Sequence, residues 1–236
     1  MEVDKRALEL NDWNCKPSAK HPRPVVFVHG LSANAWDTGY TSDPAWLSRV
    51  TARKSPLNRV PVIYGLDKME SSALQLSDFI DKDEWTLWTR IVDILGHSQG
   101  SIMPRYYFKF LGGVAKVHKF AAIGSIQYGS TLLGPVPFLT SLKLYDPIKK
   151  VVDVACLSCF QFLWDSPFIR NLNAGGDTVP GIEYLMITSN PVIQDWCPLD
   201  IDGHIPQAFD PVVFTAIDNF FSNTKFKTPT CLDYLS

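Results

Sequence analysis

The stretch Ile91-Val-Asp-Ile-Leu-Gly-His-Ser-Gln-Gly100 contains a Gly-x-Ser-x-Gly motif directly after an apolar run. The run predicts a buried strand, and residues 99–111 predict a helix that Pro104 kinks. A serine on so sharp a turn between strand and helix has strained dihedral angles, and glycines on both sides leave room for it. The helix would direct its first N–H groups towards Ser98, which favours a serine esterase or lipase.

A second motif lies upstream, where Pro24-Val-Val-Phe-Val-His-Gly-Leu31 predicts a four-residue strand that ends in His-Gly. In hydrolases with such a serine turn, one oxyanion donor comes from the loop after an early strand, and the other from the residue after the nucleophile. Here these donors are the backbone N–H groups of Leu31 and Gln99. The alternative is a plain strand-end turn with Gly30 at a positive φ angle.

A general base must activate the serine, and chain order decides among the histidines. The candidates are His21, His29, His97, His118 and His204. The triad of these hydrolases runs serine, acid, histidine, so the base follows the last strand and precedes a final helix. His204 fits, because it follows the predicted strand 182–187 and precedes Asp210 and Pro211, which predict a helix N-terminus. His118 is expected in a solvated loop, and a surface-loop role is the alternative for His204.

Together these motifs resemble the secreted triacylglycerol lipases of bacteria and fungi, the class 2 lipase family of the α/β-hydrolase fold. The resemblance is carried by Asn11–Ser18, Pro22–Trp36, Val92–Gly100 with Met103–Tyr107, Asn173–Gly181, and Cys197–Pro211. It implies a mostly parallel central sheet flanked by helices, and hydrolysis of lipid esters through an acyl-enzyme at a lipid–water interface. It implies Ser98 as nucleophile, His204 as base, and Leu31 and Gln99 as oxyanion donors.

The triad acid departs from this pattern. The family has its catalytic aspartate on a long loop after the last of these strands, whereas here Ser189–Gln194 follows almost at once, so that loop is missing. Three aspartates remain before the histidine: Asp195, Asp200 and Asp202. Asp195 is the best substitute, because it lies farthest from His204 along the chain. Asp177 precedes the strand and is interpreted as part of a turn.

Loss of the acid alone lowers the turnover of a serine triad by about 10⁴-fold, because the imidazole loses its orienting partner. We therefore expect an impaired ester hydrolase. A non-catalytic lipid-binding relative is the alternative, and acyl transfer or amide hydrolysis by the same serine is a third possibility.

Two further departures concern the sheet. Residues 37–60 contain no run of four apolar residues where the family has a helix and a strand, so one sheet strand is expected to be lost and an edge exposed. Residues 83–89 include two tryptophans and are expected to form a polar loop.

Composition is that of an ordinary globular protein, with 236 residues, 46% apolar and 19% charged residues, and a net charge of −2. We expect one domain over residues 1–236, with a cap or lid at about residues 132–170. No basic stripe, metal-ligand cluster or phosphate loop is present, so nucleic acid, metal and cofactor are not expected. The apolar stretch 151–168 is interpreted as a lid segment that lines an acyl pocket, with a buried core helix as the alternative.

Two other apolar stretches have simpler interpretations. Residues 69–80 predict a helix that packs on the sheet through Met69, Ala73, Leu76 and Ile80. Residues 120–142 are interrupted by glycines and prolines, so they are not expected to span a membrane.

Five cysteines favour an exported protein with two disulfides: Cys15, Cys156, Cys159, Cys197 and Cys231. Cys197 and Cys231 are expected to fasten the C-terminal tail, and a redox or zinc role for Cys156 and Cys159 is the alternative. The charged residues 1–10 are no signal peptide, so an extracellular protein would have had its signal removed, or the signal lies outside this chain.

Overall fold

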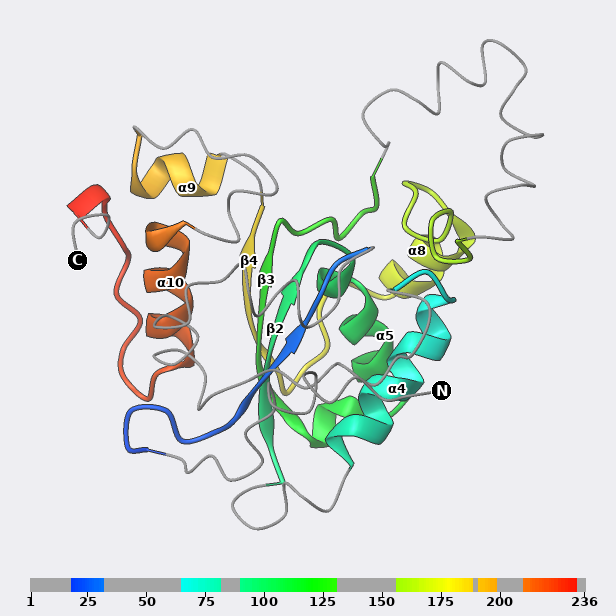
Figure 1. Ribbon diagram of the computed structural model, residues 1–236, viewed down its shortest axis with the longest axis horizontal. Coiled ribbons are helices and arrows are strands. Elements are labelled where there is room, and N and C mark those ends of the chain that lie inside the picture. The colour runs from blue at the N-terminus through cyan, green and yellow to red at the C-terminus, as the bar shows by residue number, and fades with distance from the viewer. Residues whose placement is uncertain are drawn as a thin grey trace, which may run out of the picture.

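The computed structural model describes residues 18–31, 65–81, 90–130, 156–188, 191–198 and 210–232. In this part of the chain, four strands form one sheet in the order β1-β2-β3-β4, and every neighbouring pair is parallel. They are β1 (Val25–Val28), β2 (Val92–His97), β3 (Val117–Ile123) and β4 (Glu183–Ile187). Helices cover both faces of the sheet (Figure 1), which confirms the predicted parallel sheet flanked by helices.

The helices divide between the two faces. On one side lie α4 (Met69–Ile80), α5 (Met103–Phe110) and α8 (Pro167–Asn173), and on the other lie α9 (Pro191–Trp196) and α10 (Pro211–Phe221) (Figure 1). Two short 3₁₀ turns complete the elements, η2 (Ser98–Ser101) and η3 (Gly113–Ala115). No helix in the described ranges is long and apolar enough to cross a bilayer.

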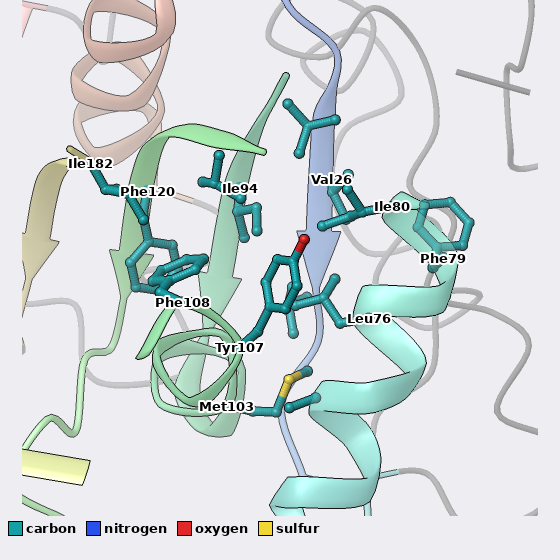
Figure 2. Packing of buried hydrophobic residues seen from close by; sticks show 14 of the residues in the cluster. Val26, Leu76, Phe79, Ile80, Ile94, Met103, Tyr107, Phe108, Phe120 and Ile182 are labelled. Atoms are coloured by element: carbon teal, nitrogen blue, oxygen red, sulfur yellow. The ribbon is translucent and has the colours of Figure 1, made fainter. Parts of the chain in front are cut away.

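The core beneath α4 and α5 is rich in aromatic residues (Figure 2). Tyr107 and Phe108 of α5 are buried against Ile94 and Phe120 of the central strands, with the Phe108 and Phe120 rings edge to face at 5.2 Å. The predicted helical stripe on α4 is confirmed, because Met69, Ala73, Leu76 and Ile80 are all buried. Burial of these side chains on a sheet face is the main force that docks both helices.

The opposite core is formed by α10. Val213, Ile217 and Phe221 pack against Phe27 of β1 and Leu95 of β2. The predicted N-terminus is confirmed as well: the Asp210 carboxylate accepts from Val212 N at 2.6 Å and from Val213 N at 3.3 Å, and Pro211 begins the helix.

The helix predicted over residues 99–111 is wrong in detail. The chain forms the 3₁₀ turn η2 first, and α5 begins only at Met103. Pro104 therefore lies in the first turn of α5, where a missing N–H removes no helical hydrogen bond, so the expected kink has no cause. His118 was predicted in a solvated loop, but it lies within β3 and is only partly exposed.

Three other predictions fall on residues outside the described ranges. They are the lost strand within 37–60, the loop at 83–89, and most of the cap at 132–170. In the described sheet, β1 is an edge strand that pairs with β2 alone.

A buried carboxylate fixes the strand register near the amino end of the sheet. Val92 pairs with Val117 but Ile94 pairs with Phe120, so β3 has one extra residue opposite Asp93. Asp93 is 1% exposed, and its Oδ1 accepts from the backbone N–H of Lys119 at 3.0 Å. The bulge leaves the backbone N–H of Lys119 without a carbonyl acceptor on β2, and the Asp93 side chain serves as its acceptor instead.

Asp93 also binds Arg23, whose Nε donates to both carboxylate oxygens at 3.1 and 3.2 Å, and His118 lies 3.7 Å away. Burial raises the pKa of Asp93 above its ordinary 3.8, and Arg23, His118 and the Lys119 N–H oppose this shift only in part. A raised pKa means that the folded chain binds the proton more tightly than the unfolded chain. The stabilisation from this group is therefore present below the unfolded pKa and is lost as the pH rises through the folded pKa.

Asp93→Asn removes this titration and keeps an amide oxygen for the Lys119 N–H. We expect the free energy of unfolding of the wild type, relative to the asparagine variant, to fall as the pH rises from about 4, the pKa of an unfolded aspartate, towards neutrality. Urea unfolding of both proteins across this range measures the difference. A wild-type advantage that grows with pH would mean that the attraction of Arg23 outweighs burial.

Candidate active site

Ser98 occupies a strained turn at the carboxyl end of β2. Its φ angle is +55°, in the left-handed region that side chains other than glycine seldom adopt. The strand ends at His97, and η2 begins at Ser98 itself. Such a backbone costs about 1–3 kcal/mol and persists only where the surroundings fix it. The strained serine between strand and helix that the motif predicts is therefore present.

The glycines on either side of Ser98 lie against other backbone segments. A Cβ at Gly96 would lie 1.9 Å from the carbonyl oxygen of Gly100, and a Cβ at Gly100 would lie 2.1 Å from that of Val28. No side chain fits at either position. The motif's glycines are thus required by close packing of the turn on itself and on the end of β1.

The loop after β1 contacts the serine. A Cβ at Gly30 would lie 3.0 Å from Ser98 Cβ and 3.6 Å from Ser98 Oγ. Gly30 does not have a positive φ angle, so close approach to Ser98 accounts for the glycine, and the alternative of a positive-φ turn is wrong. The structure thus brings the loop that leads to Leu31 against the turn that contains Ser98 and Gln99.

Gln99 is buried, and its side chain is held from a distant loop. Its Nε2 donates to the carbonyl oxygen of Gly65 at 2.9 Å. Gln99 also lines a cavity of about 30 Å³ together with Gln75 and Ser72 of α4. Sequence reasoning missed Gly65, because a single glycine ahead of a helix carries no sign of its distant partner.

The loop after β3 supports the turn from another side. Ser101 Oγ accepts from the backbone N–H of Ile126 at 3.2 Å, and Ser101 O accepts from Gln127 Nε2 at 3.1 Å. Ser125 N donates to Ile187 O at 3.2 Å, which joins this loop to the end of β4. The carboxyl ends of three parallel strands therefore meet around Ser98.

A buried arginine joins this loop to the segment before β4. Arg105 is 3% exposed, and its guanidinium donates to Gln127 O at 3.2 Å, Asp177 O at 3.1 Å and Asn173 Oδ1 at 2.7 Å. Burial lowers its pKa, and Asp177 opposes the shift. The Asp177 carboxylate accepts from the hydroxyl of Tyr128, and this bond raises the pKa of Tyr128. Asp177 thus has a structural role beyond the turn that the sequence predicted.

The other two proposed triad members are not brought together with Ser98 by the described residues. Asp195 was expected on a loop, but it lies exposed in α9, two residues before Cys197. His204, Asp200 and Asp202 lie outside the described ranges. Among the residues that the structure describes, no three His, Cys, Asp or Glu side chains gather as a metal site.

Two disulfides are present, as expected: Cys197–Cys231, whose pairing was expected, and Cys156–Cys159, whose pairing the sequence left open. Cys15 lies outside the described ranges. Cys156 and Cys159 are bonded to each other, so neither is a free thiolate for zinc, and the redox alternative for this pair stays a prediction.

The segment from Cys156 to Ser166 forms turns, so the alternative of a core helix is wrong there. Phe162 and Leu163 are buried, whereas Trp164 is 67% exposed. Trp164 lines an open cleft of about 720 Å³ whose described lining includes neither Ser98 nor Gln99. This segment thus contributes both to the core and to the wall of an open cleft.

No protein-family model matches this chain, and no curated protein matches its sequence. Solved structures do match. Lipase B of Aspergillus fumigatus superposes with a TM-score of 0.64 at 16% identity, over 90% of this chain and 56% of the lipase. The mature lipase BlEst2 of Bacillus licheniformis superposes with a TM-score of 0.54 at 14% identity, over 77% of this chain and 70% of BlEst2.

The chain thus spans little more than half the length of the Aspergillus enzyme. At these identities the likeness concerns the fold, and the resemblance to class 2 lipases stays a prediction. The parallel sheet, the helices on both faces and these superpositions show that the chain has the α/β-hydrolase fold.

Proposed function

We propose that the chain is a serine-dependent carboxylic ester hydrolase that acts on lipid esters. The observation that carries the proposal is the backbone of Ser98, at φ +55° on the turn after β2, with Gly30 of the neighbouring loop against its side chain. Structural strain of this kind concentrates at functional sites. A serine in an ordinary turn does not need a strained backbone. The strain at Ser98 therefore supports a role for this residue as the nucleophile.

In the proposed reaction, His204 removes the proton of Ser98 Oγ as the oxygen attacks the ester carbonyl. The backbone N–H groups of Leu31 and Gln99 then stabilise the oxyanion. Protonated His204 passes its proton to the departing alcohol, which leaves Ser98 acylated. Water, deprotonated by His204, attacks the acyl-enzyme, and the protonated His204 returns the proton to Ser98 Oγ as the fatty acid is released.

The partly buried apolar side chains of Leu31 and Ile126, beside the proposed oxyanion donors, favour a lipid acyl group as substrate. Leu31 packs against a buried cluster that includes Ile102, Phe162 and Phe168, with Ile126 at its border. Side chains of this kind remove water from an alkyl chain, at about 0.8 kcal/mol for each buried methylene. The likeness in fold to two proteins described as lipases supports the same substrate class.

We also propose that the protein is extracellular. Two disulfides, Cys156–Cys159 and Cys197–Cys231, are typical of an oxidising compartment.

The triad acid is proposed to be Asp195, which precedes His204 in the chain as the order of this triad requires. α9, which carries Asp195, is anchored on both sides. Ile193 is buried against the core around α10, and Cys197 is bonded to Cys231.

Ser98→Ala and His204→Ala are each expected to abolish hydrolysis of a soluble fatty-acid ester and covalent labelling by a fluorophosphonate. The reason is that one variant removes the nucleophile and the other removes the base. Mass spectrometry of the labelled peptide identifies the serine. His118→Gln is the matched control, because His118 lies at the amino end of the sheet, and this variant should label as the wild type does.

Labelling elsewhere than Ser98, or full activity in both alanine variants, would refute the proposed mechanism. Saturable binding of a fatty acid by a folded wild type without any labelling would instead favour a non-catalytic lipid-binding protein.

Asp195→Asn should lower kcat by up to about 10⁴-fold, because an amide no longer stabilises the protonated imidazole. The measurement is kcat for the same ester. Asp78→Asn changes an exposed aspartate on α4 in the same way and should leave kcat unchanged. If both variants keep the wild-type kcat, Asp195 is not the acid.

A further inference from the structure

Ser158 lies 60 positions beyond Ser98 in the chain, yet its side chain reaches the loop beside the serine turn. The residue is 0% exposed. Its Oγ donates to the carbonyl oxygen of Gly65 at 2.7 Å, and its backbone N–H donates to Leu66 O at 3.2 Å. Gln99 Nε2 donates to the same oxygen of Gly65. Because a carbonyl oxygen has two lone pairs, Ser158 and Gln99 together satisfy this acceptor.

Gly65 lies between the two segments that form the candidate site. Its φ angle is +75°, and a Cβ there would lie 2.8 Å from Gln99 Oε1 and 3.5 Å from Gly30 O. If Gly65 were displaced, it would therefore either press on the side chain of Gln99 or withdraw from it. The nearest part of Gln99 is the end of its side chain, and the bond from Nε2 to Gly65 O couples that end to the Gly65 loop.

The segment around Ser158 is itself fixed at several points. The Cys156–Cys159 disulfide closes the chain around Ser158. Gln161 Oε1 accepts from Met69 N at 2.7 Å, and Gln161 Nε2 donates to Glu70 Oε2 at 2.6 Å. Gln161 thereby caps α4, whose own N-cap residue forms no side-chain hydrogen bond. Ser158 is thus held in place relative to the loop whose carbonyl it binds.

We propose that Ser158 is a positioning residue, which acts through Gly65 to fix Gln99 at the serine turn. The proposal rests on the proposed function, in which the backbone N–H of Gln99 binds the oxyanion. An oxyanion donor acts only within a narrow range of distance, and a strained turn relaxes unless its neighbours hold it. Without the hydroxyl of Ser158, Gly65 O keeps one donor and the Gly65 loop is freer to move away from Gln99.

The first test compares Ser158→Ala with Ser166→Ala. We expect Ser158→Ala to lower kcat for a soluble ester by about tenfold, with KM changed by less than about twofold, because placement in the transition state is affected more than substrate binding. The rate of fluorophosphonate labelling should fall in parallel.

Ser166→Ala is the matched control. It also removes a buried hydroxyl from this part of the chain, one that donates to Gln161 O at 2.5 Å and accepts from Ile169 N at 3.1 Å. No contact with Gly65 is lost, so kcat should stay at the wild-type value even if stability falls. A wild-type kcat in Ser158→Ala, or an equal loss of kcat in both variants, would overturn the proposal.

A second pair of variants leaves Ser158 in place, in case Ser158→Ala does not fold. Gly65 and Gly112 have nearly the same φ angles, +75° and +77°, so alanine is strained equally at both. Only at Gly65 does the new Cβ meet Gln99, because nothing lies within 4 Å of the Cβ site at Gly112. Gly65→Ala should lower kcat as Ser158→Ala does, and Gly112→Ala should not. Equal kcat in the two glycine variants would contradict the proposal.

Hydrogen exchange tests whether Ser158 positions Gln99 even if the protein has no esterase activity. The amide of Ile102 donates to Gln99 O at 3.0 Å, so its exchange rate reports how firmly Gln99 is held. If the folded wild type neither hydrolyses esters nor reacts with the fluorophosphonate, the proposed function fails. Faster exchange at Gln99–Ile102 in Ser158→Ala than in Ser166→Ala would still support the positioning of Gln99, and unchanged exchange would overturn it.

Discussion

The close approach of three backbone segments around Ser98 is the constraint on which the candidate site depends. The turn at Gly96–Gly100 folds back on itself, lies on the end of β1, and is met at Ser98 by Gly30. Gly96 and Gly100 leave no room for a Cβ, and at Gly30 the contact with Ser98 is tight. The pairing of Val28 with Gly96 in the parallel register brings the end of β1 beside the start of the motif. The β1–β2 ladder is therefore the direct support of the strained serine.

Register matters at the other end of the sheet too. The bulge opposite Asp93 shifts β3 by one residue, after which the pairs run without interruption to His97 and Ile123 at the serine turn. The Asp93 carboxylate accepts the N–H that the bulge exposes. Because a shift of one residue turns every following side chain to the other face, this buried group helps to decide which residues line the two cores.

Around the turn, polar contacts come from segments distant in the chain. Gly65 holds Gln99, the loop at Ser125–Gln127 holds Ser101, and Arg105 ties that loop to the segment before β4. These contacts are partly buried, and an unpaired polar group costs free energy there, so each loop has one favourable arrangement. A strained backbone at Ser98 is compatible with the fold because its neighbours have little freedom to yield.

The parallel sheet was implied by the resemblance to class 2 lipases, and the sequence by itself determined the helix stripe on α4, the capped start of α10, the strained serine and the number of disulfides. These features follow from short-range patterns: hydrophobic period, capping residues, glycine spacing and cysteine number. The sequence also led to wrong expectations where tertiary contacts prevail over local pattern, as in the split of residues 99–111 into η2 and α5, and the location of His118 in β3.

Only the tertiary structure decided that Gly30 is a glycine because Ser98 lies against it, that Asp93 completes a bulged ladder, and that Ser158 and Gln99 share one carbonyl oxygen. Such contacts join residues far apart in the chain. They depend on where packed elements end in space, and no periodicity within one segment specifies that.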